Sequence, residues 1–87
     1  MTLPPEILVY GREGCHLCDQ LCEELAAVTR GRVRITVVDV DSSAELARRY
    51  GERVPVVCWA GEEICQYRLD APATRRLEQL LGRGGRD

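Results

Sequence analysis

Two cysteines three residues apart have the types and the spacing for redox chemistry. Cys15 and Cys18 stand in Cys-His-Leu-Cys, between an apolar run at residues 7–10 and a segment of helical periodicity that begins at Leu17. If Cys15 caps that helix or opens its first turn, the two Cα atoms lie about 5–6 Å apart, which a disulfide accepts. The pair therefore predicts a disulfide that forms and opens with little backbone movement.

The two thiols should have different roles. A helix N-terminus carries unpaired N–H groups and the positive end of the helix dipole, and both favour a thiolate. We therefore expect Cys15 to be the nucleophile and Cys18 to be the thiol that resolves a mixed disulfide. His16 would add positive charge beside Cys15 when it is protonated, so it is a further candidate. An exposed histidine without effect fits the sequence equally well.

The other three cysteines are expected to pack as small apolar residues. An odd total of five cysteines does not suggest a disulfide framework, and the N-terminus lacks the basic start and apolar stretch of a signal peptide. We therefore expect a cytoplasmic protein, whose compartment keeps most thiols reduced. Packing is expected for Cys22, Cys58 and Cys65. Cys22 follows Cys18 by one helical turn, so a role as a third exchanging thiol remains open.

Length and charge exclude several classes of protein. The chain has 87 residues, 45% of them hydrophobic, which suits one small domain. Its net charge of -2 and its scattered arginines give no basic surface for nucleic acid. No apolar run approaches the ~20 residues of a membrane span. We expect a monomeric domain over residues 1–82 and a disordered tail over residues 83–87.

Around the cysteine pair, the hydrophobic pattern predicts strands and helices in the order β-α-β-α-β-β-α. Proline and glycine positions mark most of the boundaries. The expected elements are a strand at 6–10, a helix from 17 to Gly31, a strand at 33–40, a short helix opened by Ser42 and closed by Gly51, strands at 54–59 and 62–67 joined by Ala60-Gly61, and a helix capped by Asp70 and ended by Gly82. This order predicts an α/β fold with a four-stranded mixed sheet flanked by three helices.

With Cys-x-x-Cys opening the first helix and Val54-Pro55 opening the third strand, the chain resembles the thioredoxin-like superfamily. Its size is similar to that of glutaredoxin-like proteins, particularly a small bacterial group with Cys-His-Leu-Cys. The resemblance covers residues 6–82. It implies a cis peptide bond before Pro55, which would pack beside the cysteine pair. It also implies that Val54 pairs with the backbone of an incoming peptide or glutathione, and Arg12 matches a position that is often basic.

The chain departs from typical glutaredoxins at three places. Glutaredoxins usually have Cys-Pro-Tyr-Cys, whereas the intervening residues here are His16 and Leu17. Arg53 stands where threonine commonly precedes Val-Pro, and residues 68–71 do not reproduce the Gly-Gly turn that helps to hold a glutathione carboxylate. We therefore expect poor turnover with glutathione. Arg12 and Arg53 remain candidates for contact with an anion or a peptide, or are solvated surface charges.

These observations predict a thiol–disulfide oxidoreductase of glutaredoxin or thioredoxin type. Its redox-active pair would need no bound cofactor or metal. Its partners would be a disulfide-containing protein or a small thiol substrate, and a reductant such as glutathione or thioredoxin reductase. One alternative is a metal or iron–sulfur module with Cys15, Cys18 and Cys22 as ligands. Another is a redox-inactive adaptor that binds extended peptides beside Pro55.

Overall fold

The protein folds as one four-stranded sheet with helices on both faces. The structure, a computed structural model, describes residues 4–85, and the side chains of residues 4–82. The strands run in the order β2-β1-β3-β4, with β1 and β2 parallel and the other pairs antiparallel. The elements are β1 (Glu6–Gly11), α1 (His16–Thr29), β2 (Arg34–Asp39), a 3-10 turn (Val40–Ser42), α2 (Ala44–Tyr50), β3 (Val56–Trp59), β4 (Glu62–Gln66) and α3 (Ala71–Gly85). The predicted α/β fold is confirmed.

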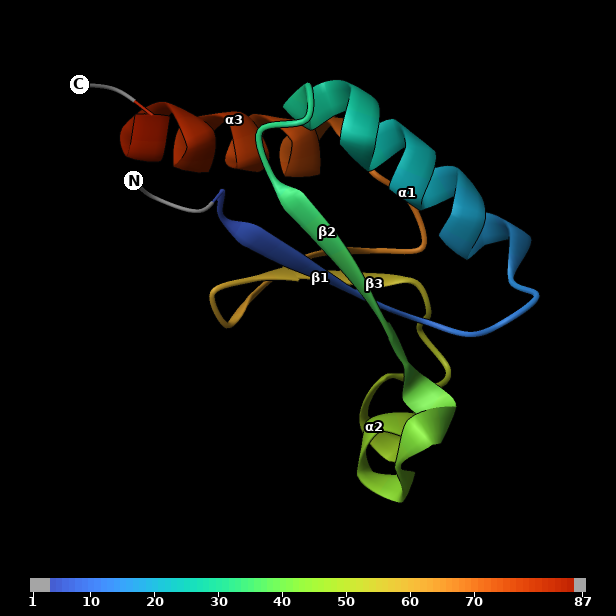
Figure 1. The fold of residues 1–87 in the computed structure, drawn as a ribbon. Helices are drawn as coiled ribbons and strands as arrows, with labels where there is room; N and C mark the ends of the chain where they lie inside the picture. Colours follow the sequence, from blue (N-terminus) through green and yellow to red (C-terminus); the bar gives the residue numbers. More distant parts are fainter. Residues whose placement is uncertain (1–3, 86–87) are drawn as a thin grey trace.

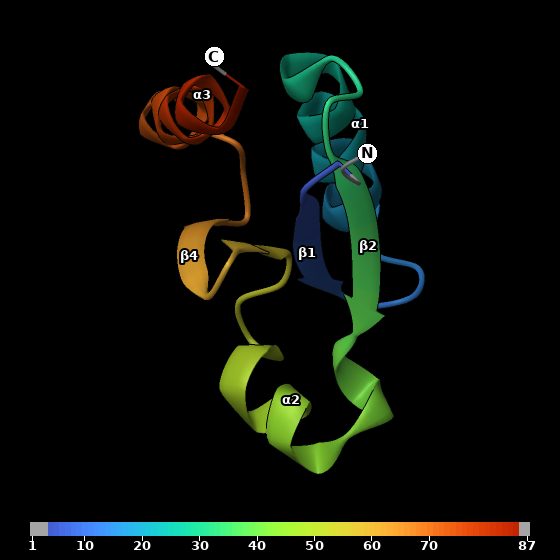
Figure 2. The ribbon, with the colours of Figure 1, turned by 60° about the vertical axis from the view of Figure 1, so that its left-hand side comes forward.

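Figure 1 shows α1 and α3 together on one side of the sheet, and Figure 2 shows α2 at its other side. Alternation along β1 explains the two layers, because successive side chains of a strand point to opposite faces. Ile7 and Val9 are fully buried beneath α1 and α3, whereas Leu8 and Tyr10 pack with the α2 cluster. Within residues 4–85, no helix is long and apolar enough to cross a membrane.

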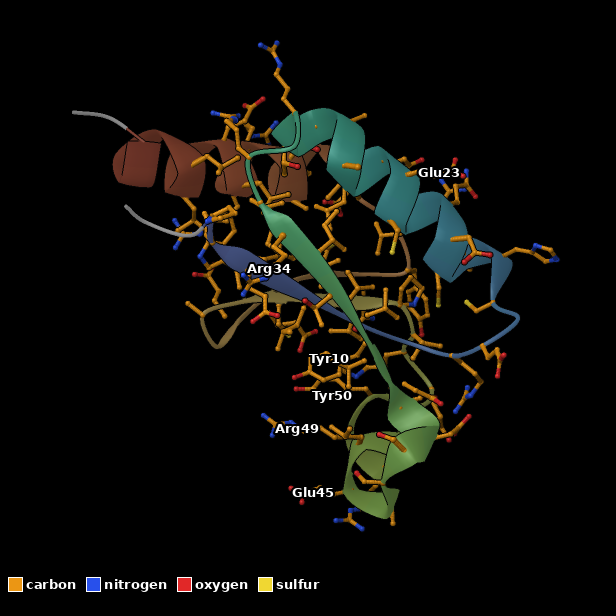
Figure 3. All side chains as sticks on the ribbon, viewed as in Figure 1. Tyr10, Glu23, Arg34, Glu45, Arg49 and Tyr50 are labelled. Carbon is orange, nitrogen blue, oxygen red and sulfur yellow. The ribbon has the colours of Figure 1, made fainter. Side chains whose placement is uncertain are left out.

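An aromatic pair fixes α2 against the sheet. The rings of Tyr10, from β1, and Tyr50, the last residue of α2, stack on each other, as Figure 3 shows. Their centres lie 4.1 Å apart. The guanidinium groups of Arg49 and Arg53 lie 5.4 and 5.5 Å from the centre of the Tyr50 ring. Stacking and cation–π contact therefore hold the end of α2 where the chain turns toward β3.

The start of α2 and the end of α3 differ from the expected boundaries, and α1 ends at Thr29, before Gly31. The cap of α2 is Ser43, whose Oγ accepts the Leu46 N–H at 3.0 Å, because Ser42 lies in the 3-10 turn and donates its hydroxyl to the Asp39 carbonyl. Helix α3 continues past Gly82 to Gly85. A helical glycine costs about 1 kcal/mol but keeps its N–H, so it does not stop a helix by itself. Residues 83–85 are thus helical rather than disordered, and residues 86–87 lie outside the described part.

The hairpin of β3 and β4 contains an irregularity that the sequence did not reveal. The predicted turn at Ala60-Gly61 is present, with φ of 51° and 87°. A bulge between Val57 and Cys58 shifts the pairing by one residue, so that Cys65 lies opposite Val57. Cys58 belongs to the α2 cluster, whereas Cys65 packs against the cluster beneath α1 and α3. These two cysteines therefore lie on opposite faces of the sheet.

Candidate functional site

The site is built at the end of β1, where the chain turns into α1. Cys15 is the N-cap of α1, with extended backbone angles, and its sulfur accepts the Cys18 N–H at 3.1 Å. The Cys15 N–H in turn donates to the Arg12 carbonyl at 3.2 Å. The half-buried Cys15 sulfur thus lies at the positive end of the helix, where unpaired N–H groups favour an anion.

The sulfur of Cys18 is enclosed one turn further on. Only 5% of Cys18 is exposed, and its sulfur lies against Gly11, where an added Cβ would stand 3.0 Å away. Burial, and then the hydrogen bond with Cys15, raise the pKa of Cys18 to about 11, although a backbone hydrogen bond from Arg12 lowers it. Cys18 is therefore a protonated thiol at neutral pH. The two sulfurs have different surroundings, as separate attacking and resolving roles require.

Cys22, one turn beyond Cys18 in α1, packs toward the sheet. Cys22 packs against the cluster beneath α1 and α3, and burial, followed by the charge of Asp19, raises its pKa. It shares with Cys18 a surface hollow of about 370 Å³ that borders the loop at residues 11–14. Among the residues that the structure describes, no three His, Cys, Asp or Glu side chains are grouped so that they could hold a metal ion. Cys15, Cys18 and Cys22 thus do not form a ligand set here.

Both arginines that the sequence singled out are held in contacts within the chain. Arg12 forms a two-pronged ion pair with Asp41, through Nε at 2.9 Å and Nη2 at 3.2 Å. Arg53 pairs with Glu63 at 2.6 Å, donates to Gln66 at 2.9 Å and also donates to the Arg49 carbonyl. An incoming anion would therefore have to compete with a carboxylate for either guanidinium.

The remaining predicted positions lie on the connection from α2 to β3 and at the start of α1. The Val54–Pro55 peptide bond is cis. Pro55 is buried and its carbonyl accepts the Tyr67 N–H at 2.8 Å, whereas Val54 is partly exposed. His16, the first residue of α1, is exposed.

Two apolar residues near the pair were not predicted as part of the site. Leu17 and Tyr67 are 44% and 43% exposed, and both line a groove of about 150 Å³ together with the half-buried Leu69. Leu17 lies within the cysteine motif, and Tyr67 is hydrogen-bonded to Pro55. The groove thus connects the helix that carries the cysteines to the segment that follows the hairpin. Leu17 could have been predicted from the sequence, because it lies between the two cysteines. The position of Tyr67 could not, because it depends on the bulge in the hairpin.

A family model described as "Glutaredoxin-like domain (DUF836)" matches residues 6–80. The chain belongs to this glutaredoxin-like family. An X-ray structure of a structural genomics target, XcR50 from X. campestris, is 35% identical, with 85% of this chain and 96% of that chain covered and a TM-score of 0.67. No curated protein sequence matches the chain closely.

More distant structures place this glutaredoxin-like protein in the thioredoxin fold. Oxidised mitochondrial thioredoxin 3 from Saccharomyces cerevisiae is 19% identical, with a TM-score of 0.50 over 92% of this chain and 78% of that chain. A structure described only as a malarial protein is 16% identical, with a TM-score of 0.51 over 93% and 97% of the two chains. At these identities the similarity establishes the fold alone, and it confirms the thioredoxin-like architecture expected from the sequence.

Proposed function

We propose that this glutaredoxin-like protein is a thiol–disulfide oxidoreductase that works through Cys15 and Cys18. The observation that carries the proposal is the contact between the two residues, in which the Cys15 sulfur accepts the Cys18 N–H at 3.1 Å at the start of α1. N–H groups directed at a sulfur favour its anionic form, which is the nucleophile in disulfide exchange. Cys18, which would resolve the mixed disulfide, thus lies one helical turn from the Cys15 sulfur that it attacks.

Exchange proceeds in two displacements. The Cys15 thiolate attacks one sulfur of the substrate disulfide, the bond between the substrate sulfurs breaks, and the leaving thiolate takes a proton from water. Cys18 then loses its proton and attacks the Cys15 sulfur, which releases the second substrate thiolate. Two electrons pass to the substrate and the protein keeps a Cys15–Cys18 disulfide. A cytoplasmic reductant, such as glutathione or thioredoxin reductase, would return the electrons, and no bound cofactor is required.

The surroundings of Cys18 support this order of steps. After burial, the largest contribution to its raised pKa is the hydrogen bond with Cys15, and the charge of Cys15 adds to it. Once Cys15 is part of a mixed disulfide, its sulfur carries no charge and both contributions from Cys15 weaken. The resolving thiol thus becomes easier to deprotonate after the substrate has been attached.

The groove beside α1 favours a protein disulfide as substrate, because its lining combines apolar side chains with polar ones: Leu17, Leu21, Tyr67 and Leu69 with Gln20, Glu24 and Arg68. We expect the partly exposed Val54 to pair with the substrate backbone, and the groove beside Leu17 and Tyr67 to receive an apolar side chain near the substrate cysteine. His16 is exposed on the first turn of α1. Because Arg12 and Arg53 are already paired with carboxylates, a carboxylate of glutathione would have to displace Asp41 or Glu63 to bind either guanidinium.

Single serine substitutions test the two roles. Cys15→Ser should abolish exchange, whereas Cys18→Ser should accumulate a mixed disulfide at Cys15, because attack and resolution use different sulfurs. The measurement is mass spectrometry of each variant after incubation with an oxidised test protein. Cys22→Ser is the control and should turn over like the unaltered protein. Equal trapping by the Cys15 and Cys18 variants would contradict the proposal.

A further inference from the structure

The side chain of Arg12 connects three segments around the cysteine pair. Its Nε and Nη2 bind both carboxylate oxygens of Asp41, and its Nη1 donates to the Gly51 carbonyl at 3.1 Å. Asp41 lies in the turn after β2, and Gly51 caps the end of α2. Because β1 and β2 are parallel, with Gly11 paired to Asp39, the loops that follow them meet at one end of the sheet (Figure 1).

The backbone of Arg12 contacts both thiol residues. Its carbonyl accepts the Cys15 N–H, and its backbone forms the hydrogen bond that opposes the raised pKa of Cys18. A shift of this one residue would therefore move the Cys15 cap and the surroundings of the Cys18 sulfur together. The side chain that anchors this backbone is 40% exposed, so its ion pair adds little to overall stability. Its effect is expected on position rather than on folding.

We infer that the Arg12–Asp41 pair is a positioning clamp that holds the Arg12 backbone against Cys15 and Cys18, rather than a free cation that binds the substrate. This inference rests on the proposed function. The guanidinium of Arg12 binds the Asp41 carboxylate with two nitrogens and the Gly51 carbonyl with the third. A lysine, with a single ammonium group, cannot reproduce this combination of contacts. Loosening the clamp should slow the attack of Cys18 on Cys15, because small displacements of reacting atoms reduce rates strongly.

Asp41→Asn and Arg12→Lys test the clamp. A second ion pair provides a matched control, since Glu62 binds Arg76 through two contacts of 2.7 Å with similar exposure, but joins β4 to α3. Glu62→Gln removes that carboxylate without touching the Arg12 contacts. Each reduced protein is mixed with one equivalent of the neutral dipyridyl disulfide in a stopped-flow instrument, so that a second thiopyridone is released only when the mixed disulfide is resolved within the chain. Release of the first thiopyridone reports attack by Cys15, and release of the second reports resolution by Cys18.

Asp41→Asn and Arg12→Lys should slow the second release by about tenfold. They should also move the pH profile of this step upward, since the Arg12 backbone bond that favours the Cys18 thiolate is weakened. Glu62→Gln should match the unaltered protein in both rate and profile. Unchanged resolution in Asp41→Asn and Arg12→Lys would overturn the clamp. If the unaltered protein releases no second thiopyridone, the proposed function itself fails.

An anionic reagent separates the clamp from substrate binding. Asp41→Asn frees the guanidinium of Arg12, so a cation that binds substrate would speed the first attack on a dicarboxylate aryl disulfide relative to the neutral dipyridyl disulfide. The clamp predicts no such gain, and slower resolution with either reagent. A selective gain with the anionic reagent, together with unchanged resolution, would assign Arg12 to substrate binding instead.

Discussion

At the scale of single residues, the site depends on the close contact between the Cys18 sulfur and Gly11, a residue without a side chain. The Cys18 sulfur lies against Gly11, the last residue of β1, and a Cβ there would also stand 3.4 Å from the Cys18 Cβ. Sulfur that is enclosed in this way keeps one position relative to Cys15. Gly11 is thus required for space, since its φ does not lie in the left-handed region reserved for glycine.

Gly11→Ala should therefore disturb resolution more than attack. The new methyl would crowd the Cys18 sulfur and displace it from its present position, so we expect resolution to slow by about tenfold while the first attack stays near normal. Overpacking should also cost about 1–3 kcal/mol in the free energy of unfolding. The second thiopyridone release and urea unfolding measure the two effects.

Gly82→Ala is the matched control for that substitution. Gly82 lies within α3, and among the described residues no atom outside the backbone of its own helix stands within 4 Å of its added Cβ. This variant should gain up to about 1 kcal/mol in unfolding free energy and resolve at the normal rate. Normal resolution in Gly11→Ala would show that the contact with Gly11 has no part in the chemistry.

At the scale of elements, local rules predicted the features that depend on neighbouring residues. Asp70 caps α3 as expected, because its carboxylate accepts the Ala73 N–H at 2.9 Å. Cys15 caps α1, and the turn at Ala60-Gly61 closes the hairpin. Each of these depends on hydrogen bonds or backbone angles within a few residues, so the sequence alone carries the signal.

The features that were not predicted depend on tertiary contacts. A regular two-residue hairpin would place Gln66 opposite Pro55, but the bulge at Val57 and Cys58 brings Tyr67 there instead. Tyr67 adopts a φ of 69°, a conformation that costs a bulky residue roughly 1–2 kcal/mol and is offset by hydrogen bonds to Pro55 and Glu52. The pairing of Arg12 with Asp41 spans 29 residues and likewise has no local signal.

The cap of α1 leads to a prediction about this helix. In the reduced protein the Cys15 sulfur satisfies the Cys18 N–H, and a serine hydroxyl can replace it in that role. Cys15→Ala removes the acceptor, so it should be less stable than Cys15→Ser by about 0.5–2 kcal/mol. Urea unfolding of both variants under reducing conditions is the measurement. Equal stability would mean that the sulfur does not support the helix.

At the scale of the whole molecule, thiols are distributed over both hydrophobic layers. Cys22 and Cys65 pack beneath α1 and α3, and Cys58 lies in the cluster between the sheet and α2. Burial raises the pKa of each of these three cysteines, and that of Cys65 to about 11. With Cys18 included, four thiols thus lose their protons less readily in the folded protein than in the unfolded chain.

The reduced protein should consequently lose stability in alkaline solution. Between pH values near 9.0, where unfolded thiols ionise, and about 11, where Cys18 and Cys65 ionise in the folded state, the unfolded chain binds fewer protons. The free energy of unfolding therefore falls as pH rises through this window, by roughly 1 kcal/mol or more. Thermal unfolding under reducing conditions, from about pH 8 to about pH 10.5, measures the loss. Cys65→Val removes one of these thiols from a packed position, so the free energy of unfolding of this variant should depend less on pH. Identical pH dependence in the variant and the unaltered protein would show that Cys65 ionises alike in the folded and unfolded states.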